Sequence, residues 1–321
     1  MLHVPVMVQE VLEGLQCQPE RIYVDGTVGL GGHAEAILSH SAPSGRLVGL
    51  DQDPANLQKA RARLQTFGSR TLLIHSNYSQ LTELLENLRI IAVAGILLDL
   101  GLSTEQLKIS GRGFSFGGDE TLDMRMNPDA QTMTAADLLK TTSESELNRL
   151  FWELGEERWA RRIARRVVQV RRLTPITTTT QLVDLIKQVV PAAAASGRIH
   201  PATRIFQALR IAVNQELEKL AAFIPQAITA LEPQGRLVII SYHSLEDRIV
   251  KRAFLHAEKS GIVQRLTKKP LVPQKEEIQR NPSSRSAKMR VAVKVSQRLS
   301  DSTGEVVSGS KLSNKRFFPL V

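Results

Sequence analysis

A glycine-rich turn follows the first apolar run of the chain. The run RIYVD ends at Asp25, and residues 26–33 read GTVGLGGH. Glycines let the backbone approach a ligand closely, and the free N–H groups of a helix that begins directly after them can hold a polar group. Gly29, Gly31 and Ala34 also match the degenerate G-x-G-x-x-A pattern of dinucleotide sites. The turn therefore predicts a nucleotide-like cofactor, and a turn that only packs a helix on a strand is the alternative.

Polar or aromatic residues also stand at the ends of the next three apolar runs. Asp51 ends RLVGLD about twenty residues after the turn, where an acid would bind ribose hydroxyls. Tyr78 lies just beyond TLLIH and could place its ring against an adenine, and Asp99 ends GILLD, where the reactive end of a cofactor would lie. The turn and Asp51 alone fit NAD equally well. Tyr78 and Asp99 favour S-adenosylmethionine, with a structural role for each as the alternative.

The elements that must position these residues alternate in type over the first part of the chain. The four apolar runs predict buried strands, and the patterns between them predict helices at 33–39, 54–67 and 79–88. Such alternation predicts parallel βαβ units with right-handed crossovers. We therefore expect an α/β, Rossmann-like beginning whose ligand binds at the carboxyl ends of the strands.

The α/β pattern breaks at Gly101. Residues 103–120 are loop-like and rich in glycine, and the segments that follow are helical without a convincing strand. Apolar stripes on one face predict helices at 156–172 and at about 201–220. We therefore predict a helical insertion inside an α/β domain, with a first core part at 1–103, the insertion at 104–215 and a second core part at 216–321.

The second core part resumes the α/β pattern. Strands are predicted at 235–241 and 289–295. A helix is predicted from Ser244, where the spacing to Asp247 suggests an N-cap and capping box. Residues 268–286 are polar and rich in Pro and Ser, which predicts a mobile loop.

Several longer blocks make the sequence resemble a known family. The blocks are DGTVGLGGHA, LDQDP, ILLDLGLSTEQL, RGFSF, LDMRM, GEERWARRIAR, HPATRIFQALRIAVNQEL and SYHSLEDRIVKR. In their order and spacing they resemble the bacterial 16S ribosomal RNA cytosine-N4 methyltransferases, from HVPVM at His3 to NPSSRSAKMR. The resemblance implies a Rossmann-like, S-adenosylmethionine-dependent methyltransferase with a helical insertion. It also implies that the substrate amine belongs to a decoding-centre cytosine of the small ribosomal subunit.

The same resemblance implies a set of cofactor contacts. They map to Gly31, Gly32, His33, Asp51, Tyr78, Asp99 and Gln106. Tyr78 stands where relatives also carry phenylalanine, a change that keeps the flat ring.

Methyl transfer from a sulfonium needs no metal, because the leaving group is already activated. Cytosine N4 is a poor nucleophile, so a hydrogen-bond acceptor on the amine would help the reaction. Asp99 is the leading catalytic candidate and His243, at the end of a later strand, is the second. A buried histidine bonded to the backbone is the alternative for His243. DNA amino-methyltransferases place Pro-Pro-aromatic after the acid, whereas Leu100 follows Asp99 here, so the carbonyl that would support the amine is left open.

Carbon-5 methylation of cytosine is disfavoured, because it requires a nucleophilic cysteine. Cys17 is the only cysteine and precedes the first predicted strand, so we expect it at the wrong edge of the sheet. A single cysteine also excludes an intramolecular disulfide framework and a zinc site of paired cysteines.

The charge of the chain predicts a polyanionic partner. The formal net charge is +10, and residues 245–321 carry 17 Lys and Arg against 7 Asp and Glu. Residues 158–172 contain seven arginines and no acid. RNA phosphates are expected to contact the C-terminal segment and the arginine-bearing helix with Arg158, Arg162, Arg165 and Arg166, and Arg112 is a further substrate-binding candidate. An extruded base could stack on Phe114, Phe116 and Tyr242. The alternatives are a solubilising surface for the arginines and anchoring of the glycine-rich loop for the two phenylalanines.

Composition sets the remaining expectations. With 42% hydrophobic and 23% charged residues and no apolar run of membrane-spanning length, we expect a folded cytoplasmic protein with no membrane contact. The expected partner is 16S rRNA within the small subunit, and a homodimer is left open. The rival functions are an NAD-dependent dehydrogenase, a methyltransferase acting on another RNA, a protein or a small molecule, and a non-catalytic RNA-binding protein that has kept the fold.

Overall fold

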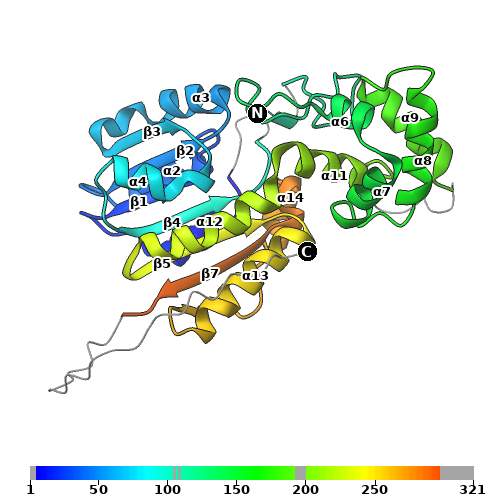
Figure 1. Ribbon diagram of the computed structural model, residues 1–321. Helices are drawn as coiled ribbons and strands as arrows, with labels where there is room; N and C mark the ends of the chain where they lie inside the picture. Colours follow the sequence, from blue (N-terminus) through cyan, green and yellow to red (C-terminus); the bar gives the residue numbers. More distant parts are fainter. Residues whose placement is uncertain (1–4, 104–105, 108–109, 192–199, 297–321) are drawn as a thin grey trace, which may run out of the picture.

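The computed structural model describes residues 5–103, 106–107, 110–191 and 200–296 (Figure 1). His3, within the HVPVM block of the resemblance, lies outside the described residues. So does 297–321, the end of the predicted basic C-terminal segment. Among the described residues, no helix combines the length and the apolar composition that a membrane crossing requires.

Seven strands form one sheet in the order β3-β2-β1-β4-β5-β7-β6. Their bounds are β1 Ile22–Asp25, β2 Arg46–Asp51, β3 Thr71–His75, β4 Val93–Asp99, β5 Leu231–Ser241, β6 Val263–Arg265 and β7 Lys288–Lys294. The first five strands are parallel, and β7 runs antiparallel to both of its neighbours. The strand order reverses between β1 and β4, which is where an open parallel sheet binds its ligand. The predicted α/β, Rossmann-like fold is confirmed.

Helices cover both faces of this sheet (Figure 1). Neighbouring residues of one strand enter different clusters: Tyr23 and Leu97 pack with one set of helices, Val24 and Leu98 with the other. Both faces of a parallel sheet are therefore apolar, as burial on both sides requires. The first set is α1 Val8–Leu15, α2 Gly32–His40 and α3 Pro54–Leu64, and the second is α4 Leu81–Asn87, α12 Glu216–Ala230 and α13 Ser244–Lys259.

A third hydrophobic cluster lies between β4 and β5 in the sequence and extends from Phe114 to Val213. Its helices are α6 Ala135–Thr141, α7 Glu144–Glu153, α8 Ala160–Arg171, α9 Thr179–Val189 and α11 Thr203–Asn214. On α8, Ile163, Ala164 and Val167 are buried and most arginines face outward. These helices lie to one side of the sheet (Figure 1), so this part of the chain has a core of its own.

Two helix predictions in this region were wrong in extent. The single helix predicted at about 201–220 is two helices, because Gln215 adopts a left-handed conformation (φ 52°) between α11 and α12. The apolar spacing continues across the break, so periodicity alone could not reveal it. The helix predicted from Glu156 begins only at Ala160, since Glu156 is also left-handed (φ 48°).

Residues 268–286 are not the mobile loop that their composition predicted. They contain α14 Lys275–Arg280 and the short 3-10 helix η3 Pro282–Ser286. The backbones of Leu271 and Met289 exchange two hydrogen bonds of 2.9 Å, and the Glu277 carboxylate accepts the N–H of Met7 at 2.7 Å. Pairing with distant segments therefore orders a stretch whose own residues favour a loop.

The capping box of α13 lies one residue earlier than predicted. His243 is the N-cap, its side chain accepts the N–H of Glu246, and the Glu246 carboxylate accepts the N–H of His243. Asp247 instead pairs with Arg290 of β7 at 2.6 Å. The predicted Ser244 box was wrong because Asp247 has a charged partner on the neighbouring strand.

Candidate active site

A cavity of about 250 Å³ opens at the carboxyl ends of β1, β2 and β4. The ends of parallel strands meet at one edge of the sheet, so the turns that follow β1, β2, β3, β4 and β5 all contribute to its wall. The cofactor candidates that line it are Gly32, His33, Asp51, Tyr78, Asp99 and Gln106. Tyr242, Arg210, Glu216, Lys219 and Glu246 complete the wall from the side of the returning chain.

The turn between β1 and α2 needs its glycines for two different reasons. A Cβ at Gly32 would lie 2.9 Å from a ring carbon of Pro5, and one at Gly26 would lie 2.9 Å from Leu98. Gly31 has a φ of 82° and caps α2, a conformation that side chains with a Cβ rarely adopt. Gly31 itself does not line the cavity. Its role in the structure is to let the turn bring Gly32 and His33 to the cavity wall.

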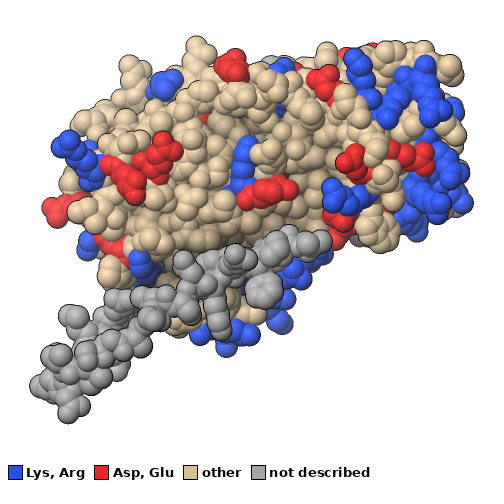
Figure 2. Space-filling view, in the orientation of Figure 1, with Lys and Arg blue, Asp and Glu red and all other residues tan. Residues whose placement is uncertain are grey.

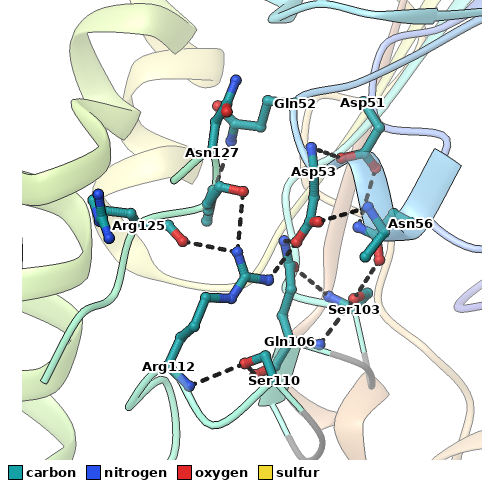
Figure 3. A network of polar contacts seen from close by, with 12 residues as sticks. Asp51, Gln52, Asp53, Asn56, Ser103, Gln106, Ser110, Arg112, Arg125 and Asn127 are labelled. Carbon is teal, nitrogen blue, oxygen red and sulfur yellow. Dashed lines mark hydrogen bonds and ion pairs between the residues drawn. The ribbon is translucent and has the colours of Figure 1, made fainter. Parts of the chain in front are cut away.

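Asp51 at the end of β2 is held by three donors. Its Oδ2 accepts the N–H of Gly29 at 2.9 Å and the amide of Asn56 at 3.3 Å, and its Oδ1 accepts the N–H of Asp53 at 2.8 Å (Figure 3). Burial raises the pKa of Asp51 to about 6, against these hydrogen bonds, which lower it. The carboxylate is thus fixed in the wall of the cavity between the first turn and α3.

Asp99 at the end of β4 is oriented by neighbours on both sides. Its N–H donates to the Thr27 hydroxyl at 2.7 Å, and its Oδ1 accepts the Tyr242 hydroxyl at 2.9 Å. Its Oδ2 lies 3.7 Å from Nδ1 of His33, whose Nε2 bonds the Val6 carbonyl at 2.8 Å. Burial and the charge of Asp99 raise the pKa of Tyr242 well above its ordinary value, so the phenol remains a donor. One Asp99 oxygen therefore accepts the Tyr242 hydroxyl, while the other lies near His33 in a side chain that lines the cavity.

Asp25 is a third strand-end acid that the sequence analysis did not single out as a site residue. It ends β1 and is almost completely buried; its Oδ1 accepts the N–H of Thr27, and its Oδ2 has no hydrogen-bond partner among the described residues. Burial, together with the charges of Asp99 and Asp51, raises its pKa to about 7, against the hydrogen bond from Thr27, which lowers it. The rule that selected Asp51 and Asp99, an acid at the end of a strand, would have found it.

The raised pKa of Asp25 predicts how the stability of the cofactor-free protein depends on pH. A folded-state pKa above the ordinary value of 3.8 means that the folded state binds the proton more tightly. This contribution is complete below about pH 4 and is lost as the pH rises towards about 7. We expect Asp25→Asn, which stays neutral, to have a higher Tm than the parent at pH 8, with up to about 4 kcal/mol involved, and a much smaller advantage at pH 5. Thermal unfolding at both pH values checks this; an equal Tm difference at pH 5 and pH 8 would contradict it.

Tyr78 and Gln106 lie in the wall of the cavity, and their side chains contact other residues of the protein. The ring of Tyr78 packs edge-on against Phe223, with centroids 5.3 Å apart. The Gln106 amide donates to Asp53 at 3.1 Å and accepts the N–H of Ser103 at 3.0 Å. Both side chains are therefore held in place before any ligand binds.

His243 lies beside the cavity and is not part of its lining. Its Nδ1 accepts the N–H of Glu246 at 3.5 Å, and its Nε2 lies 3.1 Å from a Glu246 oxygen. Burial would raise the pKa of Glu246, but the hydrogen bond and charge of His243 and the charge of Arg210 lower it below its ordinary value. The structure places His243 at the N-terminus of α13, where its side chain accepts a backbone N–H. A histidine bonded to the backbone was the alternative to the predicted catalytic role.

Glu216, His243 and Glu246 could also serve as ligands of a cation, since one ligand atom from each lies within 4.8 Å of the others. The Arg210 guanidinium, however, donates to both oxygens of Glu216 at 2.8 and 2.9 Å. Burial would lower the pKa of Arg210, but the charges of Glu216 and Glu246 raise it, so Arg210 stays charged. The positive charge that balances Glu216 is thus supplied by the protein itself.

The predicted substrate residues occupy different environments. Phe114 is buried in the cluster of the insertion, and Phe116 stacks on His200 with centroids 4.7 Å apart and meets Phe206 edge-on. These are the anchoring contacts that were the alternative to base stacking. The Arg112 side chain is mostly buried and forms an ion pair with Asp53. Tyr242 lines the cavity and bonds Asp99.

The predicted phosphate contacts on and beside α8 lie on the surface. Figure 2 shows basic side chains gathered at the end of the molecule that α8 and α9 form. The exposed members include Arg158, Arg161, Arg162, Arg165 and Arg172, while Arg166 is half-buried and donates to Gln188 at 3.0 Å. Arg158 and Arg162 lie over the ring of Trp159. We call the exposed arginines of 158–172 the α8 basic surface.

Cys17 does not line the cavity. It follows α1, away from the carboxyl ends of the strands, and burial raises the pKa of its thiol to about 12. A thiol with this pKa stays protonated, so the structure provides no nucleophilic sulfur at the site among the described residues.

The charges of the cavity distinguish the two cofactors that the turn and Asp51 alone left open. Asp51, Asp99, Glu216 and Glu246 line the cavity together with Lys219 and with Arg210, whose charge is paired with Glu216, so carboxylates outnumber the basic side chains in the wall. A dinucleotide would bring an anionic pyrophosphate to this wall, whereas S-adenosylmethionine brings a cationic sulfonium and an ammonium group. Fold and site together define a Rossmann-like, S-adenosylmethionine-dependent methyltransferase.

Comparison with known proteins places the chain within this class. A family model described as the MraW methylase family matches residues 1–295, and the chain belongs to this family. A protein of Heliobacterium mobile named ribosomal RNA small subunit methyltransferase H is 48% identical over 309 residues, 91% of this chain and 99% of its own. One of the same name from Syntrophotalea carbinolica is 49% identical over 303 residues, 90% of this chain and 96% of its own. Among solved structures, an rRNA methylase from Streptococcus thermophilus covers 92% of this chain and 100% of its own at 11% identity and a TM-score of 0.44.

Proposed function

We propose that this protein methylates the exocyclic N4 of a cytosine in the decoding centre of small-subunit ribosomal RNA. The relatives named for small-subunit rRNA methylation support the substrate class. The observation that carries the choice of an amine is Asp99, a carboxylate with one oxygen fixed by Tyr242 and the other beside the cavity. An amine that attacks a methyl group must shed a proton, and an oriented carboxylate is suited to receive its hydrogen bond.

Different residues of the site would bind the cofactor and orient the amine. S-adenosylmethionine, when bound, supplies a methyl group on a positively charged sulfur. Gly32, Asp51 and Tyr78 would hold the cofactor, and Asp99 Oδ2 would accept a hydrogen of N4 and align its lone pair with the methyl group. Tyr242 keeps Asp99 in one orientation through its 2.9 Å hydrogen bond, so little reorganisation is needed during the reaction.

Binding of the RNA is assigned to the insertion. The α8 basic surface is the densest run of exposed arginines in the described residues, and phosphate contacts of this kind position an RNA without reading its sequence. Tyr242 beside Asp99 is the aromatic residue best placed to meet an extruded base, and the stacking roles of Phe114 and Phe116 remain predictions.

The test is transfer of labelled methyl from S-adenosylmethionine to small subunits that lack the modification, followed by nucleoside analysis. Protein-free small-subunit rRNA serves as the second substrate and distinguishes naked RNA from an assembled particle. N4-methylated cytosine is the expected product. A different methylated nucleoside would overturn the choice of N4, and no transfer despite binding of S-adenosylhomocysteine would favour a protein that has kept the fold without the chemistry.

A further inference from the structure

The carboxylate of Asp53 joins three segments of the chain directly beside the cofactor cavity (Figure 3). Its Oδ1 accepts the N–H of Ala55 at 3.1 Å and caps α3. Its Oδ2 accepts the Gln106 amide at 3.1 Å and forms an ion pair with the Arg112 guanidinium. The Asp53 side chain is only 4% exposed, so its charge is balanced inside the protein and not by water.

Asp53 is linked to Asp51 by two routes. In the first, the backbone N–H of Asp53 donates to Asp51 Oδ1 at 2.8 Å. The second route starts at Gln106, which donates to the Asp53 carboxylate and accepts the N–H of Ser103. The Ser103 hydroxyl donates to Asn56 at 3.1 Å, and the Asn56 amide donates to Asp51 at 3.3 Å. The position of Asp53 therefore affects Asp51 and Gln106, two residues of the cavity wall.

Arg112 connects this network to the insertion. Its Nη1 donates to the backbone carbonyls of Arg125 and Met126 at 3.0 and 3.3 Å. Met126 lines the cavity, and its sulfur accepts the amide of Gln52, the residue between Asp51 and Asp53 in the sequence. One guanidinium thus holds both the β2–α3 turn and the segment of the insertion that lies on it (Figure 3).

We propose that Arg112 is a positioning residue of the cofactor site, through which the docked insertion holds Asp53, Gln106 and Asp51 in the geometry that binds S-adenosylmethionine. This differs from the substrate-binding role predicted for Arg112 from the sequence. The assignment concerns cofactor binding and depends on the proposed RNA substrate only where turnover is measured.

Loss of the guanidinium would act on the site in two ways. Asp53 would be left as a buried carboxylate without its charged partner, which a fold relieves by moving the side chain or by taking up a proton. Movement removes the acceptor of Gln106, and protonation weakens it. The charge of Asp53 is also one cause of the raised pKa of Asp51, so either response changes the electrostatic environment of Asp51.

The experiment compares Arg112→Gln with Arg125→Gln by calorimetric titration with S-adenosylhomocysteine. Arg125 is a matched control, because its ion pair with Asp123 and its bonds to backbone carbonyls are of the same kind but lie wholly within the insertion. We expect Arg112→Gln to raise the Kd about tenfold and Arg125→Gln to change it less than about twofold, even if both lower the Tm. Arg112→Lys, which keeps the charge on Asp53 but not the fork of donors, is expected to recover part of the loss.

A double-mutant cycle with Asp53→Asn completes the test. If Arg112 acts through Asp53, its removal costs little more once the carboxylate is gone, so the effects of the two substitutions do not add. Additive effects, an unchanged Kd in Arg112→Gln, or equal losses in the Arg112 and Arg125 variants would each overturn the proposal. In turnover assays, Arg112→Gln should raise KM for S-adenosylmethionine more than it lowers kcat. The titrations need no RNA, so they remain decisive even if the substrate assignment fails.

Discussion

Replacing Asp99 with asparagine is expected to lower kcat for methyl transfer by about 10²-fold or more. The amide keeps the shape of the carboxylate and can still accept the Tyr242 hydroxyl, but it cannot take a proton from the amine. The Kd for S-adenosylhomocysteine, measured by calorimetry, should change much less than kcat, because Asp51, Tyr78 and Gln106 also line the cavity and would still be available to the ligand. Single-turnover kinetics with small-subunit RNA separates the two effects.

Tyr242→Phe is the matched control for Asp99→Asn. It removes only the hydroxyl that holds Asp99 Oδ1, so we expect a loss of about tenfold, smaller than that of the Asp99 variant. Unimpaired turnover in Asp99→Asn would remove Asp99 as proton acceptor. A larger loss in Tyr242→Phe than in Asp99→Asn would point to the tyrosine as the more important group.

Reversing two charges of the α8 basic surface should weaken RNA binding by about 10²-fold at low salt. Arg162 and Arg165 are exposed on α8, and changing both to glutamate replaces phosphate attraction with repulsion. The slope of log Kd against log salt concentration should become shallower by about two, and the Kd for S-adenosylhomocysteine should not change. Filter binding or fluorescence anisotropy over a salt series measures both slope and affinity.

Arg46 and Arg61 provide the control for this prediction. They are exposed on the sheet domain, at the start of β2 and on α3, so their replacement by glutamate changes the net charge by the same amount. Their double variant should retain RNA affinity within about threefold. If both double variants bind equally weakly, the net charge and not the α8 basic surface controls binding.

Local patterns in the sequence were sufficient to predict six of the seven described strands and one edge of the site, but not β6 Val263–Arg265. The acids that end RLVGLD and GILLD line the same cavity because parallel strands end at the same edge of the sheet, and the glycine turn after β1 lies between them. This followed from alternation of strands and helices alone. The cofactor roles of the individual residues remain predictions.

The features that were missed depend on contacts between distant segments. Arg112 was predicted to bind the substrate, but its partner in the structure is Asp53, 59 residues earlier. The order of 268–286 comes from Met7 and Met289, which the composition of that stretch cannot reveal. The break at Gln215 lies inside an apolar stripe that continues from α11 into α12. The stripe therefore does not show where one helix ends and the next begins; the left-handed conformation of Gln215 does.

The place of the insertion in the sheet has a consequence for folding. β4 and β5 are hydrogen-bonded neighbours, yet residues 100–230 lie between them in the sequence. Closing a flexible loop of that length costs about 4 kcal/mol of chain entropy. Because the insertion has a hydrophobic cluster of its own, its collapse would bring the two strand ends closer together and lower this entropic cost. We therefore expect pairing of β4 with β5, which completes the edge that carries Asp99, to follow folding of the insertion.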